Sequence, residues 1–583
     1  MKFFRNVNYK KLFHLSSILA ASFALNKFNL NFMSNKMFCE EHPLHNVSLK
    51  TKVNIDYSHL PTYTRKEVSE HYNLDTGIWV SYKDGVYDIT EFLRIHPGGE
   101  DKIKLAAGGS IEGFWAMYTF HLDSDLVLEL LEKFRIGNLH PKDILKPSDI
   151  PDFSKLRKEK IEERSKLLDK KLTFPYCAEG PEEQISDHFY TPKDLFFVRN
   201  HNPIPNKIPI NEYEIEIEVP NDNKINHILV NNEEDDDDDI DDLIPKARTV
   251  NLGEMLKTLP IYRETVFVSC AGNKRYFMKY KDFETKGVKW RTAAIANGIW
   301  EGIYVKDFLD YINFDYKSLK VQSEIDSLNL ISTGKDKDLQ GHHYNTSVPL
   351  RDAINHGLLA YKYNGEVIPF DHGYPLRLIM PGFVGVRNVK WVDKLTISKE
   401  ESNSAYQKKD YKMIPIDKPL EEIDTNKILP VMKFQINSAI TYPVHGQTIN
   451  QDNDELKFKG WAYGESGSEI NSIELSFDEG VTWEKVDKSN IRFDYNNKGK
   501  VYSWTQWSYS ISLKDKLSFI KQKIDEKQVK SVNYHPSLKS DKIEVWVRAT
   551  DLLGNTQPID CKDIINLRGI MNNSVHKIEF DLV

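Results

Sequence analysis

A single cysteine, Cys270, follows an apolar run at 266–268 that we expect to form a buried strand. Alanine and glycine open a turn directly after it, and Lys274 and Arg275 come next. Nearby positive charge and the N–H groups of a turn favour a thiolate over a thiol. A thiolate in this position acts as a nucleophile or as a soft metal ligand, whereas an uncharged Cys270 would only fill the strand end.

Two histidines, His96 and His121, lie 25 residues apart and mark a second chemical site. The first belongs to the sequence His-Pro-Gly-Gly, in which glycine lets the backbone pass close to a flat ligand. Large aromatic side chains come before the second histidine: Phe114, Trp115, Tyr118 and Phe120. Two histidines on opposed helices, walled by apolar side chains, can bind a haem iron from both faces.

Cationic side chains gather in further loops. Arg199 follows the apolar run at 196–198, and His372 and Arg377 lie five residues apart around a turn. Lys390 comes after a glycine-punctuated loop. A ring of Arg, His, Lys and turn amides suits a ligand with a terminal phosphate, because guanidinium groups bind phosphate through two hydrogen bonds.

The segment Cys-Ala-Gly-Asn-Lys-Arg at 270–275 resembles the molybdenum-ligating segment of the sulfite oxidase and assimilatory nitrate reductase family. The resemblance implies that Cys270 ligates molybdenum and that a molybdopterin cofactor contacts Phe197, Val198, Arg199, Asn200, His201, Cys270, Asp336, His372, Arg377, Asn388, Val389 and Lys390. It implies a substrate side made of Arg199, Cys270, Arg275, Trp290 and Tyr411. A neighbouring Asp338 leaves the register at Asp336 open.

Residues 60–141 look like cytochrome b5, in which two loop-helix histidines are the axial ligands of the haem. The resemblance implies that His96 and His121 bind the iron of a haem b. Within this span, Tyr-Lys-Asp-Gly-Val-Tyr at 82–87 alternates around a turn and predicts a hairpin.

The chain of 583 residues is too long for one core and should divide into several domains. The expected fold class is α+β and multidomain, with a C-terminal immunoglobulin-like β-sandwich predicted from short alternating strands such as 543–550. We expect a mitochondrial targeting and sorting segment at 1–40, the cytochrome b5-like haem domain at 60–141, a flexible linker at 142–171, a mixed α+β molybdopterin domain at 172–417 and a dimerisation sandwich at 428–583.

The first 39 residues carry five lysines and one arginine but no acid before Glu40, and they contain an apolar core at 12–25. This composition is typical of a mitochondrial presequence followed by a sorting segment. The apolar core falls short of the roughly 20 residues that a stable membrane span needs. A secretory signal and an uncleaved membrane anchor remain the alternatives.

The formal charge of −8 comes from one acidic insert, because residues 233–242 carry nine acids and the rest of the chain therefore sums to +1 (−8 + 9). We expect this insert to be a disordered loop, with calcium or a basic partner as an alternative role. The four cysteines form no close pairs, which indicates neither a disulfide framework nor a CxxC zinc site.

The order of the modules favours one branch of the family. Haem comes first, nothing follows the sandwich, and no glycine-rich dinucleotide fingerprint follows a strand. The resemblance therefore implies a homodimeric sulfite oxidase of animal type in the mitochondrial intermembrane space. Such an enzyme oxidises sulfite at a molybdenum-molybdopterin centre and passes electrons through haem b to cytochrome c. The alternatives are a nitrate reductase-like molybdoenzyme and a non-catalytic haem electron carrier with a decayed molybdenum domain.

The sandwich departs from the family pattern at one loop. Relatives carry Ser-Gly-Gly-Gly-Arg there, whereas this chain has Gly-Glu-Ser-Gly-Ser at 464–468. The resemblance implies that Ser468 replaces an arginine that reaches the substrate pocket. Loss of that charge predicts weak, salt-sensitive sulfite binding, unless another cation takes its place.

Overall fold

The structure is a computed structural model that describes residues 57–96, 100–117, 121, 125–145, 164–219, 248–314, 316–317, 325–338, 341–418, 422–516 and 542–583. The predicted targeting segment, the acidic insert and residues 146–163 of the predicted linker lie outside these ranges. Among the described residues, no helix is both long enough and apolar enough to span a membrane.

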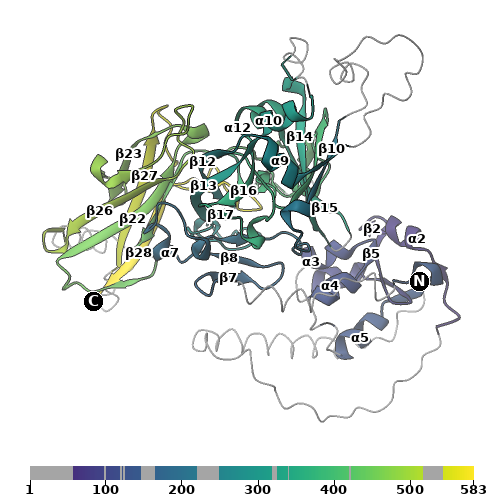
Figure 1. The fold of residues 1–583 in the computed structure, drawn as a ribbon. Helices are drawn as coiled ribbons and strands as arrows, with labels where there is room; N and C mark the ends of the chain where they lie inside the picture. The colour runs from purple at the N-terminus through teal and green to yellow at the C-terminus, as the bar shows by residue number, and fades with distance from the viewer. Residues whose placement is uncertain are drawn as a thin grey trace, which may run out of the picture.

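The first domain is a small sheet flanked by short helices (Figure 1). Its strands are β1 (Thr62–Tyr63), β2 (Tyr72–Asn73), β3 (Gly77–Tyr82), β4 (Gly85–Asp88), β5 (Gly109–Ser110) and β6 (Arg135–Leu139), in the order β1-β6-β4-β3-β2 with β5 on β3. Its helices are α2 (Arg65–Glu70), α3 (Glu100–Ile103), α4 (Glu112–Met117) and α5 (Asp125–Glu132). The antiparallel pair β3–β4, with Tyr82 opposite Gly85, is the hairpin that the alternation predicts.

The central domain is built on two five-stranded sheets and one small sheet. The first sheet runs β11 (Arg248–Asn251), β10 (Glu214–Glu218), β19 (Val392–Ser398), β14 (Asn329–Lys337) and β15 (His343–Pro349). The second contains β12 (Tyr262–Ser269), β13 (Ile295–Tyr304), β16 (Leu358–Tyr363), β17 (Glu366–Val367) and β18 (Arg377–Ile379). The small sheet contains β7 (Asp169–Leu172), β8 (Cys177–Glu179) and β9 (Val198–Arg199).

Short helices cover these sheets: α7 (Glu182–Ile185), α9 (Leu252–Thr258), α10 (Val305–Tyr311), α12 (Leu350–His356) and α13 (Ala405–Lys408). Strand β7 pairs with β8, so residues 169–171 belong to a sheet although we expected them in the linker. Val266 and Val268 of strand β12 are buried in one apolar cluster, which also contains Cys270. The strand therefore ends by delivering the cysteine into the interior of the domain.

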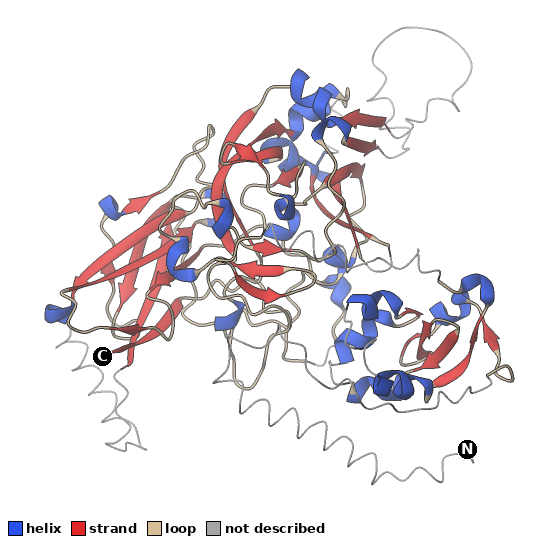
Figure 2. Cartoon of the chain, turned by 60° about the horizontal axis from the view of Figure 1, so that its bottom comes forward, coloured by secondary structure: helices blue, strands red, loops and turns tan. Residues whose placement is uncertain are grey.

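The C-terminal domain is a sandwich of two sheets, drawn almost entirely as strands in Figure 2. One sheet runs β20 (Asn437–Tyr442), β22 (Glu455–Tyr463), β26 (Thr505–Ser512) and β25 (Ile491–Arg492). The other runs β21 (Thr448–Ile449), β28 (His576–Leu582), β27 (Lys542–Asp551), β23 (Ile470–Ser476) and β24 (Glu484–Lys485). Ile543, Val545, Val547 and Ala549 are buried on one face of β27 within a core shared by both sheets, as the alternation predicts.

A buried lysine joins the central domain to the sandwich. Lys274 is fully buried, and its Nζ donates to Asn437 Oδ1 at 2.7 Å, to Ser438 O at 3.1 Å and to Ser574 O at 2.8 Å. All three acceptors belong to the C-terminal domain. The turn after Cys270 is therefore held from both domains at once.

Candidate functional site

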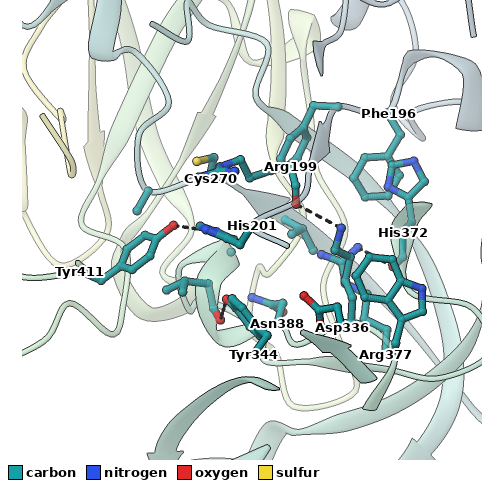
Figure 3. A pocket seen from close by; sticks show the side chains of 17 residues that line it. Phe196, Arg199, His201, Cys270, Asp336, Tyr344, His372, Arg377, Asn388 and Tyr411 are labelled. Atoms are coloured by element: carbon teal, nitrogen blue, oxygen red, sulfur yellow. Dashed lines mark hydrogen bonds between the residues drawn. The ribbon is translucent and has the colours of Figure 1, made fainter. Parts of the chain in front are cut away.

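A pocket with an empty volume of about 610 Å³ opens in the central domain at the end of β12 (Figure 3). It brings together ten of the residues singled out in the sequence: Phe197, Arg199, His201, Cys270, Asp336, His372, Arg377, Asn388, Lys390 and Tyr411. They come from segments between 196 and 411, so the pocket depends on the folding of the whole central domain.

Cys270 lies on the pocket wall with only 8% of its surface exposed. The N–H of Gly272 donates to its Sγ at 3.4 Å, and its own N–H donates to Ala294 O at 3.0 Å. The turn therefore supplies an amide donor to the sulfur, as a metal-binding thiolate requires.

One end of the pocket carries hydrogen-bonding groups suited to an anion. The Tyr411 hydroxyl and His201 Nε2 are 3.0 Å apart, the pair drawn with a dashed line in Figure 3. Burial, followed by the charges of Arg199, Lys390 and Arg568, holds the pKa of His201 well below its usual value, so the ring is neutral. Burial and the neighbouring Cys270 raise the pKa of Tyr411, which therefore keeps its proton.

The other end of the pocket contains buried charged groups with unused hydrogen-bonding capacity. Arg377 Nη1 donates to His372 O at 3.1 Å, while its Nε is buried without a partner in the described chain. Asp336 Oδ1 is likewise buried and unpaired there. Burial raises the pKa of Asp336 and lowers that of Lys390. Because unpaired buried polar groups are costly, these atoms fit a ligand that carries both acceptors and donors, such as a phosphate-bearing pterin.

Lys390 connects this end to the loop that carries Arg199. Its Nζ donates to Arg199 O at 3.1 Å, to Asp371 O at 2.8 Å and to Asn200 Oδ1. The ammonium group is thus fixed by oxygen acceptors on two loops. Asn200 does not line the pocket but supports a residue that does.

Four other predicted residues lie outside the pocket lining. Val198 packs in a separate apolar cluster, and Val389 O accepts from Leu378 N. Trp290 is fully buried and packs in the same cluster as Cys270.

The fourth, Arg275, does not present its guanidinium to the pocket. It donates to main-chain carbonyls, from Nε to Arg568 O at 2.8 Å and from Nη1 to Val288 O at 2.6 Å. A Cβ at Gly272 would lie 2.4 Å from Arg275 Nη2, so only glycine leaves room for the guanidinium there. Arg275 therefore lies behind the wall that carries Cys270.

The structure distinguishes the two aspartates of uncertain register. Asp336 lies at the pocket, whereas Asp338 lies in a part-exposed turn where it accepts from His342 N at 2.9 Å. Only Asp336 is therefore placed to contact a ligand in this pocket.

Sequence reasoning missed several contributors. Phe196 stacks on His372 with ring centres 4.0 Å apart, and Tyr344 lines the pocket while its hydroxyl donates to Val386 O. Arg568, from the C-terminal domain, pairs with Asp410 at 3.0 Å, beside Tyr411. Its local sequence, Asn-Leu-Arg-Gly, carries no signal that would connect it to Asp410, which lies 158 positions earlier (568 − 410).

Ser468, by contrast, is not part of the pocket lining. It is buried, and its N–H donates to Glu465 O at 2.9 Å within its own loop. The cation that the sandwich brings close to this site is Arg568, whose charge lowers the pKa of His201.

The first domain brings its two histidines together. The rings of His96 and His121 have centres 6.5 Å apart and planes within 8° of each other. Two imidazole nitrogens on opposite sides of one metal are about 4 Å apart, which puts the ring centres roughly 6 Å apart. Trp115 stacks beside His121 at 5.5 Å, so the pair has the spacing and the apolar wall that a haem needs.

Comparison with known proteins assigns each domain to a family. The descriptions that match are "Cytochrome b5-like Heme/Steroid binding domain" at residues 64–140, "Oxidoreductase molybdopterin binding domain" at 232–406 and "Mo-co oxidoreductase dimerisation domain" at 429–534.

Known proteins also match this chain over most of its length. The chain is 32% identical to the mitochondrial sulfite oxidase of Drosophila melanogaster, over 90% of this chain and 81% of that protein. It is 32% identical to the mitochondrial sulfite oxidase of Homo sapiens, over 88% and 84%. It is 28% identical to the NADH nitrate reductase of Solanum lycopersicum, but this match covers only 40% of that protein.

Proposed function

The chain belongs to the sulfite oxidase family, and from that premise we propose that it oxidises sulfite to sulfate and passes the electrons through a b-type haem to cytochrome c. The observation that carries the proposal is the convergence of Cys270, Arg377 and Tyr411 on one pocket from distant segments. The two histidines of the haem domain provide the exit for electrons.

The molybdenum cofactor, when bound, supplies oxygen-atom transfer and accepts two electrons. Cys270 would provide the protein ligand to the metal. His372, Arg377 and Lys390 would hold the phosphate and the pterin, and Asp336 Oδ1 would accept a ring N–H. Each of these residues already lies on the pocket wall.

Arg199 and Tyr411 would orient the substrate anion. Arg199 remains a cation, and Tyr411 remains a neutral hydroxyl donor beside the neutral ring of His201. Donors aimed at the position where negative charge develops stabilise it most effectively when they are fixed in advance. Arg275 and Trp290 would shape the wall behind Cys270 and contribute through position rather than through direct contact with sulfite.

His96 and His121 would bind the haem iron from both sides, which leaves no open position for oxygen. The relatives are mitochondrial proteins, and the basic, acid-free first 39 residues support delivery of this chain to the mitochondrial intermembrane space. The match to a dimerisation domain supports a homodimer.

One stopped-flow experiment tests the proposed activity. Sulfite is added to the oxidised protein loaded with both cofactors, and the haem absorbance is followed. We expect reduction of the haem, followed by its reoxidation when cytochrome c is added. Haem that stays oxidised in protein shown by metal analysis to contain molybdenum would contradict the proposal. Reoxidation of the reduced protein by nitrate would instead favour the nitrate reductase alternative.

A further inference from the structure

Arg164 comes just before the small sheet, where the chain between the haem domain and the central domain joins the latter. Its guanidinium forms a two-point ion pair with Asp371, from Nε to Oδ2 at 2.5 Å and from Nη2 to Oδ1 at 3.0 Å. The two side chains are only 12% and 14% exposed. The guanidinium also lies 3.9 Å from the ring centre of Tyr176. Arg164 is therefore held by two partners, a carboxylate and an aromatic ring.

Asp371 is bonded directly to the residues that shape the pocket. Its Oδ1 accepts from Asn200 Nδ2 at 3.2 Å, and its main-chain O accepts from Lys390 Nζ at 2.8 Å. Lys390 also donates to Asn200 Oδ1 and to the main chain of Arg199. The Asp371 carboxylate thus connects the linker residue Arg164 to a hydrogen-bond network that contains two residues of the pocket lining, Arg199 and Lys390.

The charges around Asp371 explain why loss of its partner Arg164 should affect the pocket. Burial alone would raise the pKa of Asp371, but the hydrogen bonds and charge of Arg164 hold it below its usual value. A buried carboxylate that loses its cation remains an uncompensated charge. Lys390, which lines the pocket, also acts electrostatically on Asp371, and its Nζ donates to the Asp371 main chain. Without Arg164, the Asp371 carboxylate would draw Lys390 away from its other acceptors, Arg199 O and Asn200 Oδ1.

An ordinary surface ion pair would not have this effect, because such pairs contribute little and are screened by salt. The Arg164–Asp371 pair differs because it is bidentate and largely buried. Lys166, two residues further on, is an exposed basic residue of the same segment, so it is a suitable control position.

We propose that Arg164 is a positioning residue of the molybdopterin pocket: by neutralising Asp371 it keeps Lys390 in its hydrogen bonds to Arg199 and Asn200 on the pocket wall, and it fixes the end of the haem-domain linker to the cofactor-binding loop. This inference rests on the proposed function only in identifying the pocket's ligand as molybdopterin. The effect acts through Asp371, because Arg164 itself does not line the pocket.

The test compares full-length Arg164→Gln, Arg164→Lys and the control Lys166→Gln, each produced with both cofactors. Molybdopterin retained after gel filtration at moderate salt is measured from the fluorescence of the released, oxidised pterin, without sulfite. We expect Arg164→Gln to lose pterin about tenfold faster than the wild type, as loss of a charge-assisted interaction implies. Arg164→Lys should recover part of the retention, and Lys166→Gln should match the wild type.

The double variant Arg164→Gln/Asp371→Asn separates positioning from folding. Removal of the buried anion together with its partner should restore retention above that of Arg164→Gln alone. Wild-type retention in Arg164→Gln, or a double variant no better than the single one, would overturn the proposal. If the wild type retains pterin but does not oxidise sulfite, the proposed function fails while this test remains valid.

Discussion

The haem site and the molybdopterin pocket are built in opposite ways. The haem site depends on two histidines 25 residues apart within one small domain, with the aromatic ring of Trp115 beside them. The pocket draws on segments from 196 to 411 and gathers several basic side chains, among them Lys390 and the buried Arg377. A short-range site needs only the local fold and an apolar wall, whereas a long-range site needs a network that holds its charges apart. A mutation at the haem site should therefore affect that site alone, whereas a mutation in the pocket should also disturb its neighbouring residues.

The largest effect is expected at the pocket sulfur. Cys270→Ser should reduce sulfite-dependent haem reduction by more than about a hundredfold, because even residues that only support a metal ligand cost tenfold to a hundredfold. The haem spectrum and its reduction by dithionite should not change, since the haem site lies in another domain. Stopped-flow absorbance with each reductant measures both. Sulfite turnover close to that of the wild type would rule out Cys270 as the ligand.

The reverse experiment targets the haem site. His121→Ala should abolish the six-coordinate haem spectrum and cytochrome c reduction, because one axial ligand is lost. Sulfite oxidation with ferricyanide, which takes electrons directly from the molybdenum domain, should survive. Parallel steady-state assays with the two acceptors separate the sites. Equal loss of both activities would show that the two sites are not independent.

The contrast between the sites also explains what the sequence could predict. The β3–β4 hairpin, the buried face of β27 and the strand that ends at Cys270 follow from alternation and turn residues, which act over a few positions. The histidine pair follows from spacing within one domain. These features depend on local chemistry and are visible without the fold.

The orientation of the arginines around the pocket was not predictable in this way. Arg275 follows Cys270 closely in sequence, yet its guanidinium bonds to the carbonyl of Arg568 from the last domain. Arg568 itself approaches Tyr411 through Asp410. The positions of these side chains depend on how two domains pack against each other. The sequence pattern of a single segment does not indicate that packing.

A moderate effect is expected at the substrate end of the pocket. Tyr411→Phe should raise the KM for sulfite about tenfold, because one hydrogen bond to an anion is lost. Burial raises the pKa of Tyr411, so the hydroxyl keeps its proton above about pH 10, the ordinary value for tyrosine. The ratio of kcat/KM between wild type and variant should therefore stay constant from about pH 6 to about pH 10. A ratio that falls towards one below pH 10 would indicate that Tyr411 ionises in this range.

The smallest effect is expected where this chain departs from the family pattern. The sequence predicts that Ser468 replaces a substrate-binding arginine, but Ser468 lies off the pocket lining and is bonded within its own loop. Arg568 already brings a cation from the sandwich to the Tyr411 end. Ser468→Arg should therefore leave the KM for sulfite within about twofold of the wild type, because position 468 does not line the pocket.

The matched variant for this comparison is Arg568→Gln. It removes a cation that stands beside Asp410 and influences His201, and it should raise the KM for sulfite about tenfold and make it less sensitive to salt. Steady-state assays at low and moderate ionic strength measure both variants. A lower KM in Ser468→Arg together with an unchanged KM in Arg568→Gln would assign the substrate contact to the 464–468 loop. The reverse pattern would mean that the last domain supplies its charge from position 568.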